Sequence, residues 1–256
     1  MIANYHTHTW RCKHAAGTER DYVEQALTAG LRILGFSDHT PYPFPDGYVS
    51  GFRMAPEQAE DYFATLADLK REYADRIEIH IGVEAEYYPA HFDALLRFLS
   101  DYPCEYLLLG QHFTDNETDG VYSGRATADE TVLARYVDQV LAGLDTGKFT
   151  YVAHPDLPNW QGSRRVYERH MGRLCRKAAE LGVPLELNFL GLQEGRCYPN
   201  RDFWRIAGEV GNAAVLGCDA HRPEALNQPR TEAAALALAA ECGVPVLETV
   251  PLANPF

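Results

Sequence analysis

Short apolar runs alternate with longer amphipathic stretches along the whole chain. The apolar runs have the length of buried strands and lie at residues 2–6, 31–37, 77–83, 106–110, 149–153, 184–188, 214–217 and 244–248. Helical patterns lie between them, at residues 57–73, 89–99, 164–181, 201–210 and 228–242. This alternation predicts parallel βα units in an α/β fold. Because 256 residues match one α/β barrel of roughly 250 residues, we expect a single domain over residues 1–256.

Several residues mark where helices should begin and end. Thr18 and Thr127 each open an acidic capping-box pattern, and Pro56 stands where the helix over residues 57–73 should begin. Gly182 and Gly243 follow two helical patterns and predict their C-terminal ends. Two long segments, residues 40–55 and 112–126, are expected to be ordered loops that shape a binding site.

The charge balance of the chain is strongly acidic. The 36 Asp and Glu outnumber the 23 Lys and Arg, which gives a formal net charge of −13. Nucleic acids and anionic membranes both attract a basic face, so neither is an expected partner. The six cysteines form no C-x-x-C pair, and the first residues lack the basic and apolar regions of a secretory signal. We therefore expect a cytoplasmic protein with reduced thiols.

The histidines gather at particular points of the predicted βα units. In such folds the functional loops lie at the carboxyl ends of the strands. Seven histidines and two carboxylates fall at or just past these ends: His6, His8, His14, His39, Glu84, His112, His154, Asp219 and His221. If the strands close into a barrel, these side chains converge on one rim.

The types and spacing of these residues indicate a metal centre. His6 and His8 share one face because strand side chains repeat every two residues, and the same holds for Asp219 and His221. Imidazole combined with carboxylate suits Zn, Mn or Fe, whereas Mg and Ca prefer all-oxygen sites. The remaining histidines lie away from strand ends and are expected to be ordinary structural residues: His80, His91 and His170.

Taken as an ordered set, these motifs resemble the polymerase-and-histidinol-phosphatase (PHP) family. The resemblance runs from residue 2 to about residue 225 and rests on His6-Thr7-His8-Thr9, His14, Asp38-His39, Gly82-Val83-Glu84, His112, His154-Pro155-Asp156 and Gly217-Cys218-Asp219-Ala220-His221. Two further segments resemble the histidinol-phosphatase branch in particular, Gly51-Phe52-Arg53-Met54 and the stretch from Glu186-Leu187-Asn188 to Tyr198-Pro199.

The resemblance implies a distorted (β/α)7 TIM-like barrel with a trinuclear metal centre at the C-terminal rim of the strands. It implies three ion sites with shared ligands: His6, His8, Glu84 and Asp219 for the first, Glu84, His112 and His154 for the second, and His14, His39 and His221 for the third. The ions would be divalent Zn, Fe or Mn, or a mixture. Glu86 would pair with a neighbouring side chain, Asp156 would orient a ligand ring, and Asp38 would either orient a ring or cap a turn.

The same resemblance implies a metal-dependent phosphatase that hydrolyses L-histidinol phosphate in histidine biosynthesis and releases inorganic phosphate. A hydroxide bridging the first two ions would attack phosphorus. Arg196 or Arg53 would stabilise the remaining phosphoryl charge, because a guanidinium matches phosphate bidentately. Asp219 or a metal-bound water would protonate the leaving alkoxide.

The chain departs from the histidinol-phosphatase branch in two places. Asn159 and Trp160 stand where that branch tends to have a basic residue. Gln193 follows Gly191-Leu192 where the branch tends to have an arginine, and the nearest arginine is Arg196. We therefore expect the phosphate-binding residues to be arranged differently from those of the branch.

Other functions remain as alternatives. The same centre could hydrolyse another small phosphate ester. An amidohydrolase also has His-x-His after its first strand, but usually needs a bridging Lys, and no Lys stands at a predicted strand end. A nuclease conflicts with the acidic charge. A metal buffer would not need ligands arranged around a rim with open coordination positions.

Overall fold

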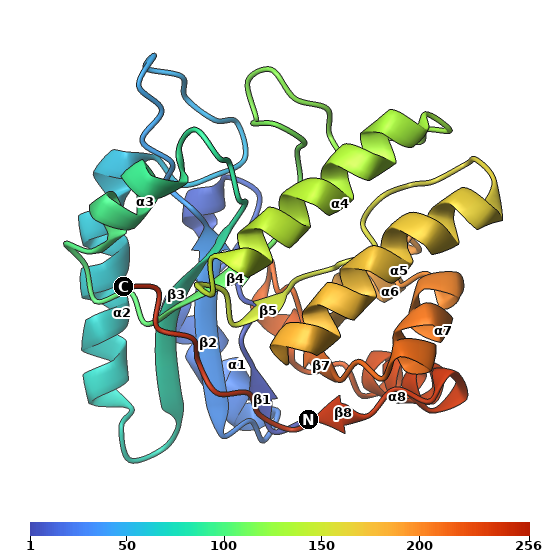
Figure 1. Cartoon of the computed structure of the whole chain (residues 1–256). Helices are drawn as coiled ribbons and strands as arrows, with labels where there is room; N and C mark the ends of the chain where they lie inside the picture. Colours follow the sequence, from blue (N-terminus) through green and yellow to red (C-terminus); the bar gives the residue numbers. More distant parts are fainter.

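The computed structural model describes all 256 residues, which form one sheet of parallel strands surrounded by helices (Figure 1). The eight strands are neighbours in chain order: β1 (Ala3–Asn4), β2 (Ile33–His39), β3 (Glu78–Ala85), β4 (Tyr106–Leu109), β5 (Tyr151–Val152), β6 (Leu185–Asn188), β7 (Ala214–Gly217) and β8 (Val246–Leu247). No pair joins β8 back to β1, but a parallel bridge between Thr7, which follows β1, and Ala220, which follows β7, brings the first and seventh strands of the curled sheet together at the rim. The predicted α/β TIM-like fold is confirmed, with the two-residue β8 added after seven βα units.

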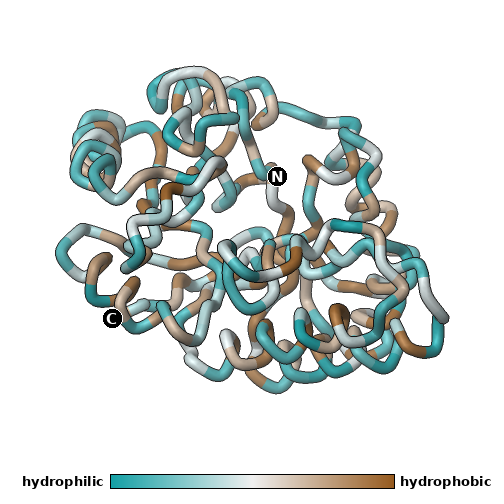
Figure 2. The backbone as a smooth tube through the Cα atoms, turned by 90° about the horizontal axis from the view of Figure 1, so that it is seen from above, coloured by the Kyte–Doolittle hydropathy of each residue, from teal (hydrophilic) through white to brown (hydrophobic).

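The helices lie around the periphery of the curled sheet, as Figure 2 shows from above. They are α1 (Glu19–Thr28), α2 (Ala59–Glu72), α3 (Phe92–Leu99), α4 (Glu130–Asp145), α5 (Arg164–Leu181), α6 (Phe189–Glu194), α7 (Arg201–Val210) and α8 (Pro229–Cys242). Three short 3-10 helices join them, η1 (Trp10–Cys12), η2 (Pro56–Gln58) and η3 (Pro223–Leu226). None of these helices combines the length and the apolar character needed to cross a membrane.

Thr18, Gly182 and Gly243 bound helices as predicted, whereas Pro56 opens the 3-10 helix η2 and α2 itself begins at Ala59. Thr18 caps α1 and forms the predicted capping box with Asp21. The prediction that Thr127 caps the next such helix is wrong, because Asp129 caps α4 and accepts a hydrogen bond from the Thr131 N–H. The Thr127 backbone instead pairs with the segment at Trp160, which holds it outside the helix.

The register of the parallel strands decides which side chains meet at the rim. His39 at the end of β2 lies directly beside Glu84 near the end of β3. On the other side of the barrel, Asn188 at the end of β6 lies beside Gly217 at the end of β7. Because all strands run in the same direction, their carboxyl ends and the residues that follow them reach one edge of the sheet.

The interior of the curled sheet is a small apolar cluster, separate from the larger core between sheet and helices. It contains Ala3, Tyr5, Tyr106, Leu108, Tyr151, Ala153, Val215 and Val250. Alternate residues of β4 divide between the two cores, since Leu107 and Leu109 face the helices. The C-terminal segment runs across the end of the sheet opposite the rim and closes this cluster from below (Figure 1).

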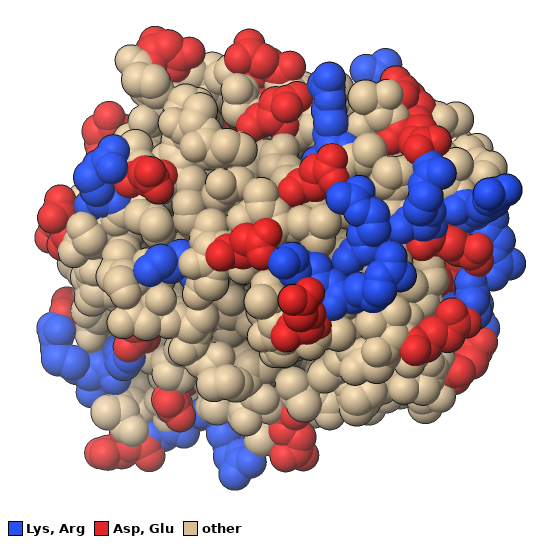
Figure 3. Space-filling view, in the orientation of Figure 1, with Lys and Arg blue, Asp and Glu red and all other residues tan.

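Basic side chains gather on the face formed by α4, α5 and α7 (Figure 3). Four of them pair with acidic side chains of neighbouring helices, in the pairs Arg169–Glu130, Arg173–Asp138 (2.6 Å), Lys177–Asp145 (2.7 Å) and Arg205–Glu168 (2.6 Å). The three pairs between α5 and α4 recur along both helices. This face is therefore an interhelical ion-pair network in an otherwise acidic protein.

Candidate metal centre and active site

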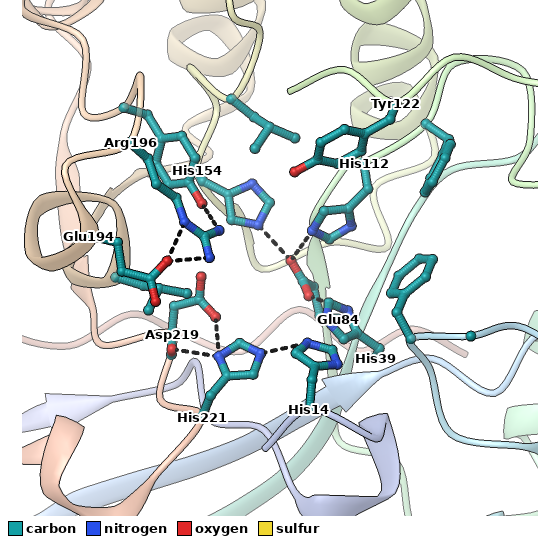
Figure 4. A pocket seen from close by; sticks show the side chains of 16 residues that line it. His14, His39, Glu84, His112, Tyr122, His154, Glu194, Arg196, Asp219 and His221 are labelled. Carbon is teal, nitrogen blue, oxygen red and sulfur yellow. Dashed lines mark hydrogen bonds and ion pairs between the residues drawn. The ribbon is translucent and has the colours of Figure 1, made fainter. Parts of the chain in front are cut away.

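A cavity of about 440 Å3 opens at the carboxyl ends of the strands. Its inner wall carries histidines and carboxylates, and its outer wall is mostly aromatic and aliphatic (Figure 4). Sixteen residues line it: His14, His39, Gly51, Phe52, Glu84, His112, Phe113, Tyr122, His154, Leu157, Leu190, Glu194, Arg196, Tyr198, Asp219 and His221. The long loops over residues 40–55 and 112–126 both contribute side chains, as predicted.

The structure brings all nine predicted ligands together. Five groups of three have potential ligating atoms within 4.8 Å of one another: His6 with His8 and Asp219, His6 with Glu84 and His154, His14 with His39 and His221, His8 with His39 and Glu84, and His8 with Cys12 and His221. His112 joins the second group, with its Nε2 atom 3.7 Å from Glu84 Oε1. His80, His91 and His170 lie outside these groups, as expected.

The contacts within the centre fit bound cations. Nε2 of His6 lies 3.1 Å from Nε2 of His8, and Nε2 of His14 lies 3.0 Å from Nε2 of His221. His39 Nδ1 and Glu84 Oε2 are buried 2.8 Å apart, yet neither makes a hydrogen bond. Nitrogen lone pairs that face each other, beside a carboxylate oxygen without a donor, are satisfied by metal ions placed between them.

Hydrogen bonds from the opposite ring nitrogens fix the orientation of most ligand rings. Each of these Nδ1 atoms donates to an oxygen away from the centre, which leaves Nε2 free to ligate. The acceptors are Glu186 Oε1 for His6 (2.8 Å), Asp38 Oδ1 for His8 (3.4 Å), Cys12 O for His14 (2.7 Å), Glu86 Oε1 for His112 (3.0 Å) and Asp219 O for His221 (3.0 Å).

The contacts of the three predicted supporting carboxylates differ. Asp38 orients the ring of His8, the first of its two predicted roles, and also accepts the His39 N–H at 2.8 Å, but it lies within β2 and caps no helix. Glu86 pairs with neighbouring side chains, as expected. Asp156 accepts the backbone N–H of Asn200 and makes no hydrogen bond to a ligand ring. Burial raises the pKa of Asp156 to about 7.

Glu186 is a supporting residue whose role the sequence did not reveal. It is fully buried at β6, and its carboxylate accepts hydrogen bonds from the His6 ring, the Tyr151 hydroxyl (3.2 Å) and the His154 backbone N–H (3.0 Å). It therefore ties one ligand ring to the backbone of another ligand. The sequence did contain one sign of this role, because Glu186 is a charged residue within an apolar run that predicts a buried strand.

The electrostatics of the centre keep its carboxylates ionised. Burial raises the pKa of Glu84, but the neighbouring His112, His39 and His6 outweigh it and hold that pKa well below its usual range. Burial likewise raises the pKa of Asp219, and His6 and His8 reverse the effect. Asp219 is thus a carboxylate suited to ligation, with no proton to donate at neutral pH.

Two histidines of the centre have strongly lowered pKa values, which favours the neutral form that a metal ligand requires. Burial and the adjacent His8 lower the pKa of His39 well below its usual value. The same two causes lower the pKa of His221 to about 3.

The two predicted phosphate-binding arginines occupy different positions. Arg196 lines the cavity, where it pairs with Glu194 and donates from Nη1 to the Tyr198 hydroxyl at 2.8 Å. Arg53 does not line it and is only 2% exposed. Its guanidinium donates to Glu86 (2.9 and 3.1 Å), Glu117 (2.7 Å) and Thr40 O (3.1 Å). Arg53 therefore supports the ring of His112 through Glu86.

Comparisons with known proteins agree with this geometry. The family model of the PHP domain matches residues 4–189. A probable histidinol-phosphatase of Deinococcus radiodurans is 31% identical over 233 residues, which cover 87% of each chain. The histidinol-phosphatase of Bacillus subtilis is 28% identical over 248 residues, covering 85% of this chain and 92% of that one.

A solved structure has the same fold. The histidinol phosphate phosphatase of Lactococcus lactis, complexed with zinc, L-histidinol and phosphate, superimposes with a TM-score of 0.73 at 20% identity. The match covers 97% of this chain and 96% of that one. The family match over most of the chain and the relative at 31% identity lead to one conclusion: this chain belongs to the PHP domain family.

Proposed function

We propose that this protein is a metal-dependent phosphatase that hydrolyses L-histidinol phosphate to L-histidinol and inorganic phosphate. The observation that carries the proposal is the convergence of seven histidines and two carboxylates on one cavity that also holds an arginine. The names of the relatives from Deinococcus and Bacillus support this substrate, as do the ligands of the Lactococcus structure.

The donor set supports three divalent transition-metal ions. We assign His6, His8, Asp219 and Glu84 to one ion, Glu84, His112 and His154 to a second, and His14, His39 and His221 to a third. When bound, such ions neutralise phosphoryl oxygens and lower the pKa of coordinated water toward about 7, which supplies a nucleophile. Zn, Fe and Mn all suit imidazole and carboxylate ligands.

The chain's own residues hold and orient the substrate. Arg196 is the one Lys or Arg in the cavity wall, so its guanidinium is the group that binds the phosphoryl oxygens facing away from the histidines. Phe52 lies edge-on to the His39 ring, with ring centroids 5.2 Å apart, and stacks with Phe113 at 5.8 Å. These rings exclude water from the centre on the side of the two long loops.

Asp219 or a metal-bound water would protonate the leaving alkoxide, and the nearby His6 and His8, which hold the pKa of Asp219 well below its usual range, favour the water. No lysine lines the cavity, which argues against an amidohydrolase.

Three further predictions accompany this function. Residues 1–256 form one domain, which the continuous core between sheet and helices supports. The protein acts in the cytoplasm, which its six free cysteines support. It binds neither nucleic acid nor membranes, which its net charge of −13 supports.

One assay tests the proposed function. The protein, reconstituted in turn with Zn, Fe and Mn, is given L-histidinol phosphate beside simple sugar phosphates, a nucleoside monophosphate and a dinucleotide. We expect kcat/KM to be highest for L-histidinol phosphate, and metal analysis to give more than one equivalent per chain. A kcat/KM for L-histidinol phosphate no higher than for the other esters would refute the substrate assignment. The proposal that the protein is a phosphatase would still stand.

A further inference from the structure

The outer wall of the cavity carries an ion pair that the metal centre does not use. Nε and Nη2 of Arg196 lie 2.8 and 2.6 Å from Oε2 of Glu194. Glu194 is the last residue of α6, and it is the one carboxylate of the cavity wall that belongs to no ligand group. In Figure 4 this pair lies across the cavity from Glu84 and His112.

The opposite part of the outer wall is suited to a flat ring. Phe52, Phe113 and Tyr122 line it, and the Phe113 and Tyr122 rings lie 5.5 Å apart. The same cavity therefore offers three surfaces to a ligand. The proposed metal ligands and Arg196 can bind a phosphate, and the aromatic side chains can pack against a ring. The Glu194 carboxylate takes part in neither of these contacts.

We propose that Glu194 is a specificity-determining residue that binds the ammonium group of a zwitterionic phosphate ester while Arg196 binds the phosphoryl group of the same molecule. This inference rests on the proposed function, because L-histidinol phosphate carries an ammonium, a phosphate and an aromatic ring. It concerns selectivity between phosphate esters rather than their hydrolysis.

The reason for selectivity is the charge balance of the pair. Without ligand, Arg196 and Glu194 neutralise each other. A ligand with both a phosphate and an ammonium replaces this one ion pair with two, so that neither side chain loses a counter-charge. A phosphate ester without an ammonium occupies Arg196 and leaves Glu194 without a partner beside an anion, which weakens its binding.

The test compares two substrates that differ in one group: L-histidinol phosphate and its desamino analogue, in which hydrogen replaces the amino group. The ratio of their kcat/KM values is measured for the wild type, Glu194→Gln and Glu194→Asp. We expect Glu194→Gln to lower this ratio about tenfold, since Glu194 is half exposed and its charge partly screened. Glu194→Asp keeps a carboxylate and should retain part of the preference.

A matched control and a binding measurement complete the test. Glu209 pairs with Arg205 on the surface of α7, so Glu209→Gln removes a similar ion pair far from the cavity and should leave the ratio unchanged. Titration calorimetry of L-histidinol with the metal-loaded protein, in the presence of inorganic phosphate to occupy Arg196, should give an about tenfold weaker dissociation constant for Glu194→Gln. This dissociation constant is measured without catalysis, so it reports on binding alone.

The outcomes separate the two proposals. If the wild type hydrolyses L-histidinol phosphate but Glu194→Gln changes both esters by the same factor, the role of Glu194 is refuted and the proposed function stands. If the wild type does not hydrolyse L-histidinol phosphate, the proposed function fails, and this inference fails with it.

Discussion

At the scale of single residues, the centre depends on backbone geometry that its side chains do not favour. His154 and Asp219 have φ angles of 29° and 48°, in the left-handed region that non-glycine residues rarely adopt. Such conformations cost about 1–3 kcal/mol each and persist where neighbours hold them. The His154 N–H donates to Glu186, and Asp219 Oδ2 accepts from Asn188. Buried polar residues therefore stabilise the strained positions of two proposed ligands.

Arg53 gives a prediction about one ligand. Its guanidinium neutralises Glu86, whose Oε1 accepts the Nδ1–H of His112 at 3.0 Å. We expect Arg53→Met to leave Glu86 without its counter-charge, to misplace His112, and to lower metal content by about one equivalent, as measured by plasma mass spectrometry after gel filtration. Arg53→Lys keeps the charge and should retain more metal. Full metal content in Arg53→Met would contradict this role.

Gly110 gives a second prediction, because its position leaves no room for a side chain. A Cβ atom there would lie 1.9 Å from Oε1 of Glu84, the carboxylate shared by two proposed ion sites. We expect Gly110→Ala to displace Glu84 and to lower kcat about a hundredfold or more, because a misplacement of about 1 Å costs that much. Gly172→Ala, in the middle of α5, meets only a flexible arginine side chain and serves as the folded, active control.

At the scale of elements, strands and long helices could be predicted because their periodicity is strong. The observed strands lie within or next to the apolar runs, and α5 and α7 span the predicted residues. The short α6 was missed, because six residues give no helical period and its N-cap Asn188 also ends a strand. The prediction that Thr127 caps α4 was wrong for a different reason. A local capping pattern cannot reveal that the Thr127 backbone pairs with a segment more than thirty residues away.

The junction of α2, β3 and β4 carries a pH prediction. Partial burial raises the pKa of Glu105, but His80, Lys70 and the Ile81 N–H outweigh it and lower that pKa to about 2. A lowered pKa in the folded state stabilises the protein above the ordinary value of 4.5, and this stability is lost as the pH falls toward 2. Since the group is partly exposed, we expect about 1 kcal/mol at neutral pH.

Glu105→Gln tests this junction. Urea unfolding should show the variant about 1 kcal/mol less stable than the wild type at pH 7, with the difference shrinking below a pH of about 4.5. Glu57→Gln is the control, because Glu57 is exposed and makes no ion pair. A stability difference that stays constant as the pH falls would show that packing, and not charge, explains the loss.

At the scale of the whole molecule, the sequence predicted which histidines and carboxylates meet at the rim, because their meeting follows from topology. Any residue at the carboxyl end of a parallel strand reaches the same rim, so nine ligands could be selected without knowing distances. The roles of Arg53 and Glu194 could not be predicted this way. They depend on how long loops and a short helix fold back over the rim, which no sequence period describes.

The ion sites should also contribute to the stability of the whole fold, because their ligands come from segments between residues 6 and 221. Ions present at about a thousand times their dissociation constant stabilise the folded state by about 4 kcal/mol. For a chain of this size that corresponds to a Tm change of about 10 °C. We expect a chelator to lower Tm by about that amount, and added Zn to restore it, as measured by scanning calorimetry.

Two histidine variants make that stability prediction specific to the centre. His154→Ala removes a proposed ligand of the second ion, so its Tm should fall clearly less on chelation than that of the wild type. His91→Ala removes a histidine that lies outside the centre against Phe44, and its response to the chelator should match the wild type. Since both variants lose an imidazole, only the position of the ring distinguishes them. An equal response of all three proteins would place the stabilising ions somewhere other than this rim.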